Sequence, residues 1–239
     1  MLTIARGELI QIFRNRLVLV TALVLPAALS AFFIAKHDLF TQVGSLGYIA
    51  TLALFFVAGI GLYTTTVTTL ASRRQNLFLK RLRSTAAGDA GILGGLLLPI
   101  TVLSVLQIAV ILSALALVAG TPSDPLLLVA AVVSVVVMML ALGLATAGLT
   151  NSPEHAQVTT LPVSLGVIAV SGWVGVTGTG DLTLLKRLLP GGSATELVLN
   201  AWNGGVPLSD SLVLFGPTLA WVVVAVALAT RLFRWEPRR

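Results

Sequence analysis

The chain has 239 residues, of which 56% are hydrophobic and only 10% are charged, and its mean hydropathy is +1.00. A soluble domain of this size could not bury so much apolar surface, because roughly a quarter to a third of its surface stays exposed to water. A disordered chain is excluded because it would have the opposite composition. The net charge of +6 falls in short patches between apolar runs, which argues against nucleic-acid binding. We therefore expect an integral membrane protein.

Six apolar runs are each long enough to cross a bilayer as a helix, which takes about 20 residues. The runs are Leu17–Ala35, Gly47–Leu70, Gly91–Val118, Leu126–Gly148, Val158–Val176 and Ser211–Thr230. None of them contains Lys, Arg, Asp or Glu. A transmembrane β-barrel would show alternating segments of about 10 residues instead. The pattern predicts an all-α polytopic membrane protein, with residues 1–239 forming a single transmembrane domain.

The positive charges predict the orientation of these spans. If the N-terminus is inside, 12 of the 15 Lys and Arg residues lie on the cytoplasmic side and 3 outside, whereas the acidic residues divide almost evenly. The inside set is Arg6, Arg14, Arg16, Arg73, Arg74, Lys80, Arg81, Arg83, Arg231, Arg234, Arg238 and Arg239; the outside set is Lys36, Lys186 and Arg187. By the positive-inside rule, both termini and residues 71–90 are expected in the cytoplasm and residues 177–210 outside.

Residues 1–16 have the pattern of an amphipathic helix on the membrane surface. One stripe of the helix is apolar and holds Leu2, Ala5, Leu9, Ile12 and Phe13. The opposite face is polar and includes Glu8, Gln11 and Arg14. Such a helix lies in the interface and leads into the first span. A simple anchor and a role in coupling are equally open interpretations.

Residues 71–90 form the longest cytoplasmic connection and carry five cations. On a helical wheel Phe78, Leu79 and Leu82 form an apolar stripe, and Leu77 lies within the basic arc, where it would project away from the membrane. The arc consists of Arg73, Arg74, Lys80, Arg81 and Arg83. One interpretation is a solvated basic face near anionic headgroups. The other is a short helix, parallel to the membrane, that docks into a cytoplasmic partner.

Residues 177–210 are expected to hold two short helices outside the membrane. Asp181 can cap the first helix, and Pro190, Gly191 and Gly192 would end it. The run Ser193-Ala194-Thr195-Glu196 matches a capping box for the second helix, which Asn203-Gly204-Gly205 would end. The helices are too apolar to stand in water, so they should dip toward the membrane or lie across the exit of a path between spans. Alanine at the two glycines should then favour one continuous helix.

The sequence contains no motif for catalysis or for energy conversion. There is no G-x-x-x-x-G-K-[ST] motif, no buried ionisable residue in a span and no cysteine, and the two histidines lie far apart, so we expect no metal site and no enzyme activity. Glu154 and His155 are neighbours in a short turn, but no nucleophile or second carboxylate accompanies them. If the chain moves a substrate uphill, another protein must supply the energy.

One segment carries a specific resemblance to a known family. Residues 74–86 read Arg-Gln-Asn-Leu-Phe-Leu-Lys-Arg-Leu-Arg-Ser-Thr-Ala. Together with six spans and an amphipathic first helix, this resembles the permease subunits of bacterial ABC-2 type exporters. Family members usually show an Arg-Glu pair, then Gly-Thr-Leu-Lys-Arg-Leu-Arg, a small residue, Thr and Pro. Residues 79–83 match position by position, whereas Gln75 replaces the Glu, Leu77 the Gly and Ala86 the Pro.

The resemblance implies a coupling helix and a set of partners. By it, the outward residues of the basic segment meet a separate ABC ATPase, bound in two copies, which carries the ATP and Mg²⁺; these residues are Arg73, Arg74, Leu77, Lys80, Arg81 and Arg83. A second permease subunit, identical or related, completes the transporter in a bacterial plasma membrane. Residues 177–210 resemble the family's extracellular re-entrant helical hairpin, which makes Pro190, Gly191, Gly192 and Glu196 candidates for an extracellular gate.

The uncharged spans suit export of an apolar or amphipathic substrate, such as a drug, an antibiotic or a lipid-like molecule. The alternative function is a membrane-embedded sensor or assembly partner that translocates nothing.

Overall fold

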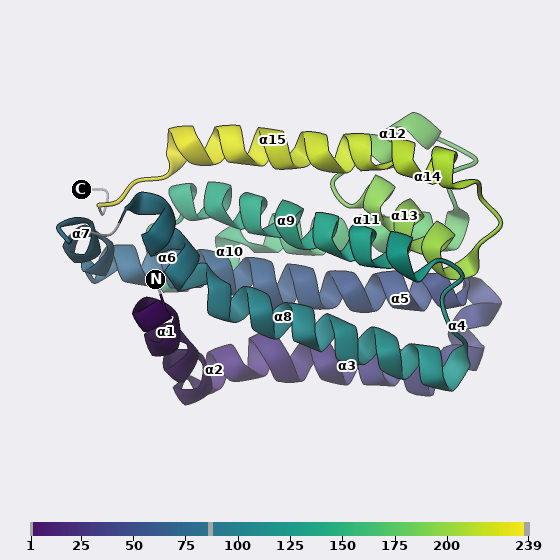
Figure 1. The fold of residues 1–239 in the computed structure, drawn as a ribbon, viewed down its shortest axis with the longest axis horizontal. Helices are drawn as coiled ribbons and strands as arrows, with labels where there is room; N and C mark the ends of the chain where they lie inside the picture. The colour runs from purple at the N-terminus through teal and green to yellow at the C-terminus, as the bar shows by residue number, and fades with distance from the viewer. Residues whose placement is uncertain (1, 86–87, 237–239) are drawn as a thin grey trace.

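The computed structural model describes residues 2–85 and 88–236, and these residues form helices and no strands. Ala86 of the family-like segment, and Arg238 and Arg239 of the cation count, lie outside the described residues. The long helices run side by side along the long axis (Figure 1). Helix α7, Phe78–Arg83, and the first described helix lie at one end, which we call the α7 end. Helix α13, Gly192–Asn203, lies near the other, which we call the α13 end.

Six helical segments among the described residues are long and apolar enough to cross a membrane. The first comprises α2 (Arg16–Leu19), η1 (Val20–Val24) and α3 (Leu25–Ala35); the second comprises α5 (Leu46–Phe55), η2 (Phe56–Tyr63) and α6 (Thr64–Gln75). The third is α8 (Asp89–Ala119) and the fourth α9 (Pro125–Leu149); the fifth comprises α10 (Pro153–Thr159) and α11 (Leu161–Thr177), and the sixth α14 (Leu208–Val213) and α15 (Phe215–Leu232). The six predicted spans are confirmed as helices, so this is a multi-pass membrane protein.

The second and fourth spans form the centre of the bundle. Within their most apolar stretches, 78% and 67% of the residues are buried, against 17% to 28% in the other four spans. Helix α9 packs against α6, α13 and α15, and α5 packs against α3, α8, α11 and α13. The peripheral spans instead expose many leucine and valine side chains. Exposing these side chains to water would be unfavourable, whereas the acyl chains of a bilayer form an apolar environment that accommodates them.

The first and second spans meet where each contains a π-helical segment. Pro26 lacks an N–H, so a carbonyl in the preceding turn loses its usual helical partner. The η1 and η2 segments pack together, and the backbone carbonyl oxygen of Ala22 lies so close to Gly61 that a Cβ there would come within 2.9 Å of it. Gln107 of α8 donates an amide hydrogen bond to the carbonyl of Leu23 at 2.9 Å. These contacts join three spans in the middle of the bundle.

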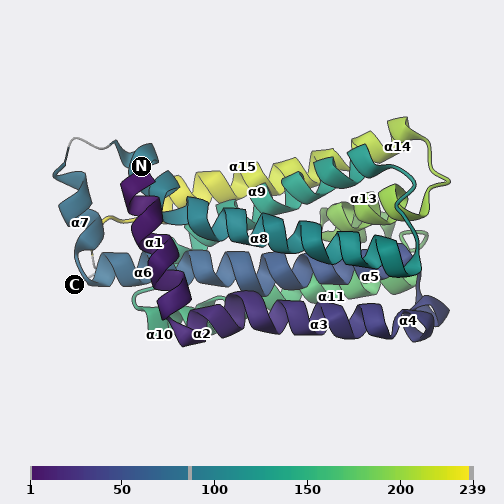
Figure 2. The same ribbon diagram turned by 60° about the horizontal axis from the view of Figure 1, so that its bottom comes forward.

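Five shorter helices among the described residues lie outside this six-span framework: α1, α4, α7, α12 and α13. Helix α1, Leu2–Arg14, crosses the α7 end at an angle to the long helices (Figure 2). Helix α4, His37–Val43, connects the first two spans at the α13 end. Helix α12, Thr183–Leu188, is followed by α13, which folds back into the bundle and packs against α5, α9 and α11. The expected pair of short helices between the fifth and sixth spans is therefore present.

Candidate functional site

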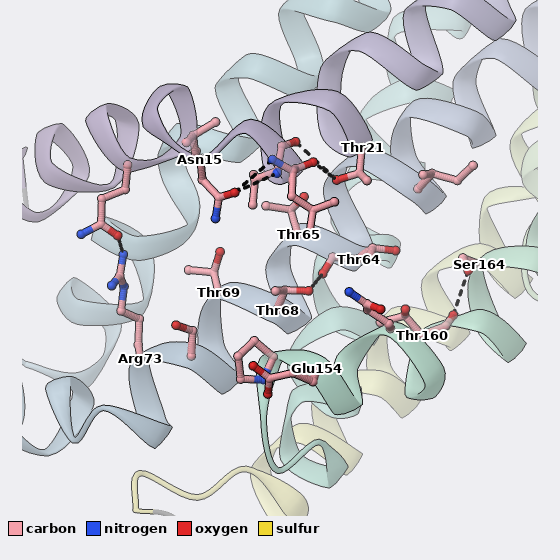
Figure 3. Close-up of a pocket in the computed structure, with 18 of the residues that line it drawn as sticks. Asn15, Thr21, Thr64, Thr65, Thr68, Thr69, Arg73, Glu154, Thr160 and Ser164 are labelled. Atoms are coloured by element: carbon pink, nitrogen blue, oxygen red, sulfur yellow. Dashed lines mark hydrogen bonds between the residues drawn. The ribbon is translucent and has the colours of Figure 1, made fainter.

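A cavity of about 790 Å³ opens among the first, second and fifth spans. Its walls come from α1 and α2 on one side, α6 in the middle and α10 with α11 on the other side (Figure 3). The polar lining residues are Glu8, Gln11, Asn15, Thr21, Thr64, Thr65, Thr68, Thr69, Ser72, Arg73, Glu154, Gln157, Thr160 and Ser164. The apolar part is formed by Ile12, Leu17, Val18, Ile60, Pro153, Leu161 and Leu165. A cavity of this size and mixed lining can hold an organic molecule.

Most hydroxyl groups in this cavity are satisfied by their own helix. Thr68 donates to the carbonyl of Thr64 at 2.8 Å, Thr160 to Ala156 at 2.7 Å and Ser164 to Thr160 at 2.8 Å. Such back-bonding lets threonine and serine enter an apolar helix without an unpaired donor. Because a hydroxyl has one hydrogen and two lone pairs, each of these groups still has acceptor capacity.

A partly enclosed ion pair borders the cavity at the α7 end. The guanidinium of Arg73 donates to both carboxylate oxygens of Glu8, through Nε at 2.7 Å and one terminal nitrogen at 2.8 Å, and it also contacts Gln11. The side chains are 15% and 8% exposed. The pair therefore joins α1 to α6. Glu8 of the predicted polar face is thus paired with Arg73 of α6.

The other face of α1 remains apolar and exposed. Leu2, Leu9 and Phe13 are exposed, whereas Ala5 and Ile12 are buried and α1 packs against the start of α8. The predicted single stripe is thus divided into a packed side and an open apolar side.

Helix α7 presents two different faces. Leu79 is fully buried, and Phe78 and Leu82 pack against the core, as the predicted stripe requires. Leu77, just before the helix, is 46% exposed. Lys80 pairs with Glu236 at 3.1 Å and Arg83 with Asp89 at 3.2 Å, but both cations remain more than half exposed.

Arg73 and Arg74 do not share the outward face of α7. Helix α6 continues to Gln75, and Leu77 has a left-handed backbone with φ of 57°. The predicted basic arc treated residues 73–83 as one continuous helix, but the break at Leu77 places Arg73 and Arg74 on α6 and the other cations on α7, which runs in a different direction. Arg74 is only 3% exposed and donates to the carbonyl of Thr150. The outward set among the described residues is thus Leu77, Lys80, Arg81 and Arg83.

The α13 end is closed by packing and hydrogen bonds. Leu197, Val198, Ala201 and Trp202 of α13 are buried. Asn203 accepts from the amide of Gly47 at 3.1 Å, and the backbone amides of the connection between α8 and α9 donate to carbonyls of α13 at 2.8 and 3.1 Å. Helix α13 therefore joins the ends of the second, third and fourth spans.

Two further cations hold α12 and α13 in place. Lys186 is 2% exposed and donates to Thr177 Oγ1 at 2.9 Å and to the carbonyl of Gly178 at 2.7 Å. Arg187 makes a bidentate pair with Glu196 at 2.7 and 2.6 Å. The hydrogen bonding of the Arg187 guanidinium to the Glu196 carboxylate raises the pKa of Arg187 above its ordinary value.

The predicted caps of these two helices are wrong. Helix α12 begins at Thr183 after Leu182, which has φ of 54° and no side-chain cap, so Asp181 does not cap it. Helix α13 begins at Gly192, and Ser193 donates to the carbonyl of Arg187 instead of capping. Glu196 pairs with Arg187 because the fold brings α12 beside it. Gly191, with φ of 93°, makes the turn between the helices, and Gly204 follows the end of α13 as expected.

The threonine cavity is the feature that sequence reasoning missed. The run Thr64-Thr65-Thr66-Val67-Thr68-Thr69 is a local signal, but threonine is common in membrane helices and keeps the run apolar on average. The cavity exists because the first and fifth spans leave this part of α6 uncovered.

No family model matches the chain, and no curated protein matches it. Among the residues that the structure describes, no group of three or more His, Asp or Glu side chains could hold a metal ion. The function must therefore be argued from the cavity, helix α7 and the closed α13 end.

Proposed function

We propose that the chain is the transmembrane permease subunit of an ATP-driven exporter of the ABC-2 type. It moves an apolar or amphipathic substrate, such as a drug, an antibiotic or a lipid-like molecule, out of a bacterial cell. A separate ABC ATPase, bound in two copies and carrying ATP and Mg²⁺, drives the cycle. A second permease subunit, identical or related, completes the path, and membrane lipids surround it. We propose no catalytic role for any residue of this chain.

The observation that carries this proposal is the two-faced helix α7. Its apolar face is anchored on the core by Leu79, so a push on the opposite face would be transmitted to α6 and α8, against which it packs. Leu77, Lys80, Arg81 and Arg83 supply an exposed leucine surrounded by cations. This combination suits a shallow groove with acidic rims on a partner protein.

The backbone of Leu77 gives the family resemblance independent support. Leu77 stands where members of the ABC-2 permease family usually have glycine, and its φ of 57° is one that glycine adopts without strain. Leu77 therefore forms the turn between α6 and α7 that a glycine would form in those permeases, at some cost in backbone strain.

The two ends support a path with one side open and the other closed. The cavity lies toward the α7 end of the bundle, and α13 fills the α13 end. We infer that the α7 end and both termini are cytoplasmic, in agreement with the distribution of Lys and Arg. The cavity then admits cargo from the cytoplasm or the inner leaflet, and the hairpin of α12 and α13 is extracellular, with Pro190, Gly191, Gly192 and Glu196 at its turn and ion pair.

If the chain is an exporter subunit, an ABC ATPase should be encoded beside it, and co-purification with that ATPase tests the proposal. We expect Leu77→Ala and Arg81→Glu to insert normally but to lose the ATPase or substrate-stimulated ATP hydrolysis. Leu182→Ala, an exposed leucine at the α13 end, is the matched control and should retain both. If Leu77→Ala and Arg81→Glu keep full complex formation and transport, α7 is a headgroup-binding patch and a sensor or assembly role replaces the exporter.

A further inference from the structure

The charges in the cavity wall do not cancel. Arg73 is neutralised by Glu8, with which it makes two hydrogen bonds. Glu154 also lines the cavity, and it makes no ion pair among the described residues. The lining therefore has one unmatched negative charge. Arg14 and Arg16 are exposed at the same end and are not part of the lining.

Four hydroxyl groups beside the cavity, on α6 and at the start of α11, present only hydrogen-bond acceptors. Thr64 and Thr68 donate their single hydroxyl hydrogens to backbone carbonyls of their own helix, as do Thr160 and Ser164. Only lone pairs remain on these oxygens, so they match a ligand that carries N–H groups. The oxygens of Gln11 and Asn15 on the opposite wall accept from Arg73 and from the α2 backbone. The amide donors in the lining are those of Gln11, Asn15 and, on α10, Gln157.

We propose that the cavity binds an organic cation with N–H donors and an apolar body, and that Glu154 selects its positive charge. The donors face the hydroxyl lone pairs of α6 and α11, and the apolar body lies against Ile60, Leu161 and Leu165. An anion is disfavoured because it would have to displace Glu8 from Arg73. This inference rests on the proposed function in treating the cavity as the place where cargo enters, and it adds the chemical class of the cargo.

Ethidium and dihydroethidium separate charge from shape. Both have a phenyl-substituted three-ring skeleton with two amino groups, planar in ethidium and slightly bent at the reduced ring carbon of dihydroethidium. Only ethidium is cationic, and both fit a cavity of about 790 Å³. Binding of each dye to the purified chain in phosphatidylcholine nanodiscs is measured by fluorescence, and the signal from empty nanodiscs is subtracted. Oxygen is excluded, because it would oxidise dihydroethidium. We expect ethidium to bind about fivefold more tightly, because one carboxylate at contact distance in a wet site favours a cation by that order.

Substitution at Glu154 shows whether this carboxylate is responsible. Glu154→Gln should remove the preference for ethidium and leave dihydroethidium binding unchanged. Glu236→Gln removes a carboxylate at the same end but outside the cavity lining, and should leave the preference intact. Thr68→Val, which removes one acceptor without changing shape, should weaken both dyes by a similar factor.

Three results on relative affinity would overturn the inference. They are an equal affinity for both dyes, a preference that survives Glu154→Gln, or tighter binding of the anion anilinonaphthalene sulfonate than of ethidium. No measurable ethidium binding would also reject the site. The assay contains no ATPase, so it fails or succeeds separately from the exporter proposal: selective binding without ATP-driven transport rejects only the exporter, and transport without selective binding rejects only the cation site.

Discussion

The two ends of the bundle contain similar polar residues but use them differently. At the α7 end, hydroxyls and charges surround a cavity, and Lys80 and Arg83 are largely exposed. At the α13 end, Lys186 is buried against backbone oxygen and Arg187 is held by Glu196. The first arrangement leaves polar atoms available to a ligand or partner, whereas the second saturates them within the chain. The difference predicts that substitutions at the α13 end change mainly stability and that substitutions at the α7 end change mainly binding.

The largest expected effect is at Gly192. A Cβ there would overlap the backbone carbonyl of Lys186, so Gly192→Ala must shift α12 away from α13. We expect a loss of about 3 kcal/mol in unfolding free energy, measured by thermal unfolding in detergent. This reverses the expectation from sequence that alanine would stabilise a continuous helix.

Gly172→Ala is the matched control for Gly192→Ala. A Cβ at Gly172 in α11 meets no atom within 4 Å, so this change should stabilise the chain by about 1 kcal/mol. Equal effects of the two changes would show that α12 and α13 are not packed tightly.

The next effect is at the ion pair beside the cavity. Arg73→Met leaves the carboxylate of Glu8 largely buried and without its partner. We expect a loss of about 2 kcal/mol, less than for a fully enclosed pair because the cavity borders it. Adding Glu8→Gln should recover about 1 kcal/mol, since no charge is then left unpaired. A double variant that is less stable than Arg73→Met would show that the pair does not join α1 to α6.

Lys186 gives a smaller test at the closed end. Lys186→Met keeps much of the apolar stem but removes two hydrogen bonds and the contact with the Trp173 ring, whose centroid lies 5.1 Å from Nζ. The expected loss is about 1.5 kcal/mol, read from urea or thermal unfolding. Lys36→Met, at an exposed lysine of the same end, should change stability by less than about 0.5 kcal/mol. Similar losses at both positions would argue against the internal role of Lys186.

The smallest expected effect compares two leucines with left-handed backbones. Leu77 and Leu182 have φ of 57° and 54°, one near each end. Leu77→Gly and Leu182→Gly should each stabilise the chain by about 1 kcal/mol, because glycine relieves the strain. Alanine at either position should give no such gain. Only Leu77→Gly should weaken the proposed complex with an ABC ATPase, and equal complex formation by both glycine variants would contradict a docking role for Leu77.

The sequence by itself determined the all-helical membrane class, the six spans and the helical hairpin before the last span. These features depend on local physics: about 20 apolar residues cross a bilayer, and backbone groups in lipid must bond within their own helix. It also identified the apolar stripe of α7, since three residues within one turn and a half share a face. The capping box failed because Ser193 and Glu196 found partners on α12 that only the tertiary fold supplies.

Only the tertiary structure decided which polar residues stand free and which are satisfied. Glu8 and Arg73 are 65 positions apart, and no periodicity indicates that they meet. The threonines of α6 line a cavity because the first and fifth spans lie apart at that level. Nearer the α13 end, Gly61 lets the first span approach the second span closely, and Gly59 does the same for the fifth span. Burial, charge pairing and cavities depend on distances between helices, and those distances follow from the packing of all six spans together.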